Sequence, residues 1–96
     1  MRNALLAGLI VSLATLPAFA GEAPAGASAC SGCHAASSKV STPAPRLIGL
    51  TAGDIESAMR AYRTGERPAT VMDRIAKGFS EDEVKAIAQW YAAQKE

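Results

Sequence analysis

Histidine and cysteine are scarce in this sequence of 96 residues, which contains one histidine and two cysteines. A large excess of either charge is also missing, since ten basic residues face nine acidic ones. Nucleic acids and anionic membranes bind clustered positive charge, so neither is expected as a partner. A structural zinc site needs four protein ligands, and one histidine with two cysteines is too few. Strand-like alternation and internal repeats are absent as well, so the sequence predicts an all-α chain.

Residues 1–20 have the layout of a secretory signal peptide. Arg2 supplies a positive charge ahead of the apolar run 4–16, and the sequence Pro-Ala-Phe-Ala after it ends in a small-x-small cleavage pattern at Ala20. The apolar run is shorter than the roughly 20 residues that span a bilayer as a helix, so stable membrane insertion is not expected. We expect cleavage after Ala20, which leaves residues 21–96 as one exported, periplasmic domain. Its basic and acidic residues balance, because Arg2 is the one charged residue removed.

Two long helices are predicted by their end signals. Thr51 begins one helix, with Asp54 in an approximate capping box, and Gly65 lies where a C-terminal cap belongs. Ser80 and Glu83 form a capping box at the start of the last helix. Both helices carry apolar residues at the spacing of one helical face, so each is expected to bury that face.

Three shorter segments complete the expected domain. Residues 27–36 are rich in alanine and contain no proline, which predicts a short helix. Two prolines within residues 39–49 disfavour helix in the residues before them, so this stretch is predicted to be an extended loop. Residues 70–77 are predicted to form one or two helical turns.

The pentapeptide Cys-Ser-Gly-Cys-His at residues 30–34 has a spacing with a chemical reason. On a helical turn, the sulfurs of Cys30 and Cys33 can reach the two vinyl groups of one protoporphyrin, while His34 coordinates the iron from one side. A thioredoxin-type redox pair would require a preceding strand in a βαβ pattern, and none is predicted. The motif therefore predicts one covalently bound haem c.

A second axial ligand for the iron has to come from outside this motif, because His34 is the one histidine. A bis-histidine site within the chain is excluded, and methionine, another weak ligand or an open position remains. Met59 lies at core spacing on a predicted helix, whereas Met72 lies in an irregular segment able to aim a thioether at iron. The residues alone favour Met72 and leave Met59 as an alternative. Methionine ligation raises the reduction potential and blocks small ligands, which is typical of an electron carrier.

The order of these motifs resembles that of the class I c-type cytochromes. It runs from Cys-x-x-Cys-His through Pro45-x-Leu47-x-Gly49 and Met72 to a terminal helix with Trp90-Tyr91. More narrowly, residues 69–80, with the sequence Ala-Thr-Val-Met-Asp-Arg-Ile-Ala-Lys-Gly-Phe-Ser, resemble the cytochrome subunit of flavocytochrome c sulfide dehydrogenase, in a form with one haem.

The resemblance implies a small class I cytochrome c fold, with three to four helices around one covalently bound haem. It assigns haem-binding roles to six residues: thioether formation to Cys30 and Cys33, iron ligation to His34 and Met72, and neighbouring contacts to Pro45 and Leu47. The proline carbonyl would accept the Nδ1 proton of the histidine and fix the orientation of its ring. The leucine would line one face of the haem.

The resemblance also implies periplasmic electron transfer, most narrowly as the electron-accepting subunit of a flavoprotein sulfide dehydrogenase. The chain has no Gly-rich flavin-binding fingerprint, so sulfide chemistry would belong to a partner chain. The chain itself is thus expected to be an electron-transfer protein and not an enzyme. Two alternatives stay open, namely a freestanding carrier between respiratory or photosynthetic complexes and a small-ligand sensor with an open sixth position.

Overall fold

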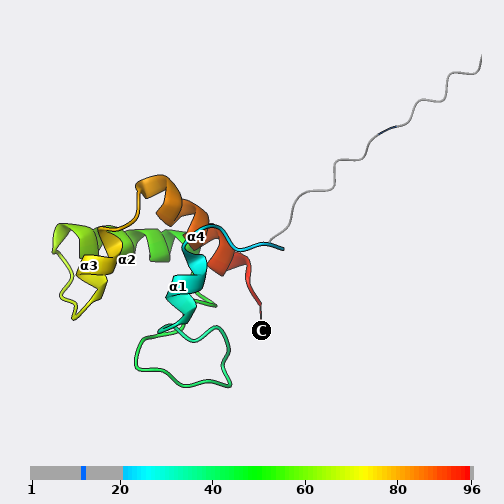
Figure 1. The fold of residues 1–96 in the computed structure, drawn as a ribbon, viewed down its shortest axis with the longest axis horizontal. Coiled ribbons are helices and arrows are strands. Elements are labelled where there is room, and N and C mark those ends of the chain that lie inside the picture. Colours follow the sequence, from blue (N-terminus) through cyan, green and yellow to red (C-terminus); the bar gives the residue numbers. More distant parts are fainter. Residues whose placement is uncertain (1–11, 13–20, 96) are drawn as a thin grey trace, which may run out of the picture.

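A computed structural model describes residue 12 and residues 21–95, and these contain four helices and no strand beyond one isolated bridge. In chain order the helices are α1 (Ala27–Ser31), α2 (Ala52–Thr64), α3 (Met72–Ala76) and α4 (Glu81–Ala93). Helix α2 packs against both α3 and α4. Figure 1 shows α2 along the middle of the fold, with α1 and α3 projecting to the same side of it. The predicted all-α fold is confirmed.

The ends of α2 follow from its cap residues. Thr51 has extended backbone angles, and its hydroxyl accepts a hydrogen bond from the backbone N–H of Asp54 at 3.1 Å. At the other end Gly65 adopts the left-handed conformation with φ 80°, which glycine reaches without a Cβ clash. Its N–H donates to the carbonyl of Tyr62. Both predicted caps are confirmed.

Helix α4 begins with the predicted capping box. The Ser80 hydroxyl accepts from the Glu83 N–H at 3.1 Å, and the Glu83 carboxylate accepts from the Ser80 N–H at 2.9 Å. These two hydrogen bonds lower the pKa of the Glu83 carboxyl, because they favour its charged form. The buried face of the helix comprises Val84, Ile87, Ala88 and Tyr91, as the spacing predicts.

Helix α1 is shorter than the sequence predicts. The expected helix over residues 27–36 is wrong in its second half, since α1 ends at Ser31 and Gly32 is its C-cap. One further turn persists beyond the helix, because the N–H of His34 donates to the carbonyl of Cys30 at 2.8 Å. Glycine and serine are weaker helix formers than alanine, which explains the early end.

Helix α3 confirms the predicted helical turns within residues 70–77. It has no side-chain hydrogen bond at its N-cap, Val71, and both Val71 and Ile75 are exposed. A five-residue helix is not stable by itself in water, so its position depends on contacts with the rest of the fold.

The hydrophobic core joins α1, α2 and α4. It consists of Ala27, Ile55, Ile87, Ala88 and Tyr91. The Tyr91 hydroxyl donates to the carbonyl of Ala27 at 2.6 Å, which ties α4 to α1. Burial raises the pKa of Tyr91, so its hydroxyl keeps the proton that it donates.

The predicted signal peptide, residues 1–20, lies outside the described residues apart from residue 12. Among the residues described, none of the helices combines the length and the apolar character that crossing a bilayer requires.

We expect the Tyr91→Phe variant to lower the free energy of unfolding of the holoprotein by about 1–2 kcal/mol, because the buried Ala27 carbonyl loses its donor. Urea unfolding followed by circular dichroism measures the change. Tyr62→Phe is the matched control, since the Tyr62 hydroxyl makes no hydrogen bond within the described residues. Equal losses in the two variants would contradict a special role for the Tyr91 hydroxyl.

The capping box should make stability depend on acid. A carboxyl whose folded pKa lies below its unfolded value stabilises the fold above the unfolded pKa, and this contribution disappears as the pH falls through the folded pKa. The stability difference between the wild type and Glu83→Gln should therefore shrink as the pH falls from 7 to below about 4. Glu81→Gln, in the same helical turn without this hydrogen bond, should show a smaller pH dependence, and a pH-independent difference for Glu83→Gln would argue against the assignment.

Candidate functional site

The Cys-x-x-Cys-His motif spans the end of α1 and the turn that follows it. Cys30 is half-buried and packs against the core cluster, Cys33 is exposed, and both are free thiols. His34 follows directly, with its N–H bonded to the Cys30 carbonyl. All three side chains therefore leave one turn of backbone, as attachment to a single group requires.

The imidazole of His34 is oriented by the loop that follows. Its Nδ1 lies 2.5 Å from the carbonyl oxygen of Pro45. A carbonyl can only accept, so Nδ1 carries a proton, and in the neutral imidazole Nε2 then presents its lone pair, as a metal ligand requires. The loop is fixed by the hydroxyl of Thr42, which donates to the Ala44 carbonyl at 3.0 Å and accepts from the Ala35 N–H at 3.3 Å.

The two thiols have different surroundings. Burial raises the pKa of the Cys30 thiol, because a thiolate is disfavoured beside apolar side chains. Its neutral S–H contacts the carbonyl of Gly26 at 3.9 Å.

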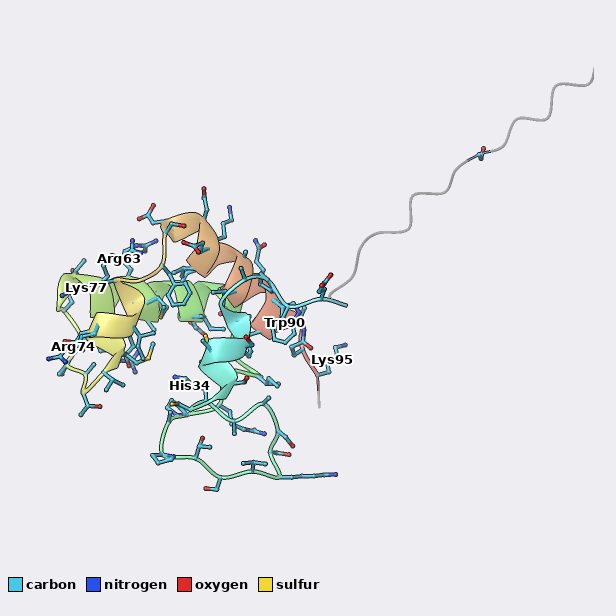
Figure 2. All side chains as sticks on the ribbon, viewed as in Figure 1. His34, Arg63, Arg74, Lys77, Trp90 and Lys95 are labelled. Carbon is cyan, nitrogen blue, oxygen red and sulfur yellow. The ribbon has the colours of Figure 1, made fainter. Side chains whose placement is uncertain are left out.

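Apolar side chains lie on the loop after this turn and on the segment that carries Met72, residues 66–79. Leu47 and Ile48 are half-buried and pack against the same core cluster as Cys30. Leu50, Val71 and Ile75 remain 40–54 % exposed. In Figure 2, His34 lies at the end of α1 and Arg74 on α3, on the same side of α2. Two thiols, an oriented imidazole, a thioether and apolar side chains are the donor set and lining that a c-type haem needs, so the residues present fit this group.

The two candidate methionines have different environments. Met59, on α2, packs against the core cluster, whereas Met72 is not among the described side chains that do so. Met72 is half-buried and is the first residue of α3. Its neighbour Asp73 has a buried carboxylate oxygen, Oδ1, with no hydrogen-bond partner among the residues described.

The six residues assigned from the sequence fall into two groups. The structure brings Cys30, Cys33 and His34 together on one turn, with Pro45 bonded to the histidine, and Leu47 packs against the same core cluster as Cys30. Met72 lies on α3, a separate element. The haem-binding roles of all six residues remain predictions.

Sequence reasoning missed the contacts that hold the Met72 segment to α2. The Arg63 guanidinium donates to the carbonyl of Phe79, and the Arg67 guanidinium lies 5.2 Å from the centroid of the Tyr62 ring. In the sequence, these arginines lie among acidic residues such as Glu56 and Glu66, a pattern typical of a solvated surface. Nothing in a helical period indicates that an arginine will contact a carbonyl in another segment.

Comparison with known proteins finds related cytochromes, although no family model matches the chain. The chain is 36 % identical over 62 residues to the cytochrome subunit of sulfide dehydrogenase of Chlorobaculum tepidum, with 65 % of this chain and 56 % of that protein covered. It is 35 % identical over 83 residues to cytochrome c-554(548) of Halomonas halodenitrificans, with 79 % of this chain and 100 % of that protein covered. It is 33 % identical over 81 residues to the thiosulfate dehydrogenase electron acceptor of Thiomonas intermedia, with 80 % and 37 % covered.

The share of each relative that this chain covers differs among the three. The chain spans about half of the sulfide dehydrogenase subunit and about a third of the thiosulfate dehydrogenase acceptor, but the whole of cytochrome c-554(548). The full coverage of cytochrome c-554(548), at 35 % identity, shows the family. The chain therefore belongs to the small c-type cytochromes, proteins that transfer electrons through a covalently bound haem.

Proposed function

We propose that this cytochrome transfers electrons in the periplasm through one haem, attached to Cys30 and Cys33 and ligated by His34 and Met72. The His34–Pro45 hydrogen bond is the observation that supports this best, because it leaves Nε2 of His34 free for a metal. When bound, haem supplies an iron that alternates between the ferrous and ferric states.

The chain's own residues have three tasks in this proposal. Cys30, on α1, and Cys33, in the turn after it, would hold the macrocycle beside α1, which is bonded through Ala27 to α4. The carbonyl of Pro45 accepts from Nδ1 and so fixes the orientation of the imidazole. Leu47 and Ile48 exclude water from the site and lower the local dielectric constant, which influences the reduction potential.

Met72 is the proposed distal ligand because Met59 already has a packing role. The Met59 side chain packs against the core cluster, and this packing explains a methionine at that position without any bond to iron. Met72, at the start of a short helix outside that cluster, has no such role among the described residues. A thioether ligand there would close the iron to small molecules.

Export belongs to the same proposal. Residues 1–20 would be removed after Ala20, and residues 21–96 would form the mature haem domain. Free cysteines at Cys-x-x-Cys spacing in an exported chain would then be consumed by haem attachment.

We further propose that the electron donor is a flavoprotein sulfide dehydrogenase, for which this chain serves as the electron-accepting, non-catalytic subunit. The name of the Chlorobaculum tepidum relative, the cytochrome subunit of sulfide dehydrogenase, supports a sulfide dehydrogenase as the partner. The Thiomonas intermedia relative, named an electron acceptor of a different sulfur-compound dehydrogenase, supports the same direction of electron flow.

A freestanding carrier is the second candidate. The observation that favours it is the match to cytochrome c-554(548), because this chain covers that protein completely. A free carrier would meet its partners through small, short-lived contacts, as redox encounters commonly do.

The distal ligand can be tested with a matched pair of variants. In the ferric holoprotein, Met72→Ala should abolish the weak absorption band at the red end of the visible spectrum that marks methionine ligation, whereas Met59→Ala should keep it. The ferrous Met72→Ala protein should also bind carbon monoxide readily, because its sixth position is open. Loss of the band in Met59→Ala alone would assign the ligand to Met59, and rapid carbon monoxide binding by the wild type would favour a sensor.

The partner can be tested on the tagged holoprotein purified from its own cells. A sulfide dehydrogenase subunit should elute with about one flavin per haem, and anaerobic addition of sulfide should reduce the haem in the eluate. A monomer without flavin, whose haem is not reduced by sulfide, would contradict the subunit assignment and support the freestanding carrier.

A further inference from the structure

The segment that carries Met72 has few local interactions of its own. Residues 66–71, which connect α2 to α3, are all exposed. Helix α3 has five residues and no side-chain cap, and its N-cap Val71 has φ −135° and ψ −26°. Short, uncapped and exposed segments have low local stability, so contacts outside the segment determine where it lies.

Contacts with the last turn of α2 fix both ends of this segment. At its beginning, the N–H of Arg67 donates to the Ala61 carbonyl at 3.2 Å, and the Arg67 guanidinium lies 5.2 Å from the Tyr62 ring centroid. At its end, the guanidinium of Arg63 donates to the Phe79 carbonyl. Tyr62 and Arg63 are consecutive residues, so one helical turn holds the segment before and after Met72.

The contact at the beginning of the segment is the closer one to Met72 along the chain. It combines a backbone hydrogen bond with an attraction between a cation and an aromatic face. Arg74 provides a contrast, because it lies on α3 itself and its side chain makes no hydrogen bond, ion pair or ring contact in the described part of the chain. Figure 2 shows Arg74 at the α3 end of the fold, below Arg63.

We propose that Arg67, held by the face of Tyr62, is a positioning residue that keeps Met72 in place as the distal ligand. This inference rests on the proposed ligation of the iron by His34 and Met72. A methionine that leaves the iron takes its short segment with it, and the Arg67–Tyr62 contact resists that movement. The contact therefore favours the ligated state.

Imidazole binding to the ferric holoprotein measures this effect, because imidazole competes with the distal ligand for the iron. A cation–π contact at an exposed site corresponds to a change of about two- to fivefold in an equilibrium constant. We expect Arg67→Ala and Tyr62→Leu each to bind imidazole about two- to fivefold more tightly than the wild type. Arg67→Lys and Tyr62→Phe keep a cation and a ring, and should bind imidazole with affinities near that of the wild type.

Two controls separate the proposed contact from other causes. Arg74→Ala removes the same charge close to Met72 without breaking a contact, and should bind imidazole as the wild type does. The double variant Tyr62→Leu with Arg67→Ala should show no more change than either single variant, because both remove one interaction. Wild-type affinity in Arg67→Ala, or an equal gain in Arg74→Ala, would overturn the inference.

Met72→Ala distinguishes failure of this inference from failure of the proposed ligation. If Met72 ligates the iron, Met72→Ala should bind imidazole far more tightly than any of the contact variants, because no distal ligand competes. Unchanged imidazole affinity in Met72→Ala would remove the proposed ligation and this inference with it. A large gain there, with none in Arg67→Ala, would remove the positioning role alone.

Discussion

The hydrogen bond from the Tyr91 hydroxyl to the Ala27 carbonyl is the link on which the haem motif depends. Helix α1 has five residues, too few to be stable alone. It nevertheless carries Cys30 and leads directly into Cys33. The 2.6 Å bond joins the first residue of α1 to a buried side chain of α4, 64 positions away in the sequence. Helix α4 has its own capping box and buried face. The hydrogen bond therefore stabilises α1 by attaching it to a more stable helix.

Hydrogen bonds also fix the conformation of the loop that follows α1 and orients His34. The hydroxyl of Thr42 bonds the loop to itself and to the backbone of Ala35, one residue after the histidine. The carbonyl of Pro45 is thereby placed 2.5 Å from the imidazole Nδ1. A proline two residues earlier and the one at this position restrict the loop to extended conformations, so the chain loses little freedom when the carbonyl takes its place.

Local signals in the sequence predicted the long helices well and α1 poorly. Thr51, Gly65 and the Ser80 capping box are read within a few residues, and the structure confirms all of them. The expected length of α1 was wrong because alanine content outweighed Gly32 in the prediction. The motif and the family resemblance identified the haem, and the His34–Pro45 contact that the resemblance implies is present. The contacts of Tyr91 with Ala27 and of Arg63 with Phe79 could not be predicted, since they join residues that no local pattern relates.

The two sides of the proposed haem site are held by different means, and this asymmetry bears on its chemistry. On the histidine side, the haem would be held by two covalent thioethers, one of them from Cys30, which packs against the core. A proline carbonyl would fix the imidazole as well. On the methionine side, a single thioether would come from a five-residue helix whose ends contact α2 through Arg63 and Arg67. In the proposed site, loosening would therefore begin at Met72. A carrier needs iron coordination that persists in both redox states, so under the proposed ligation the contacts of α2 with the Met72 segment would support electron transfer alongside the motif that binds the haem.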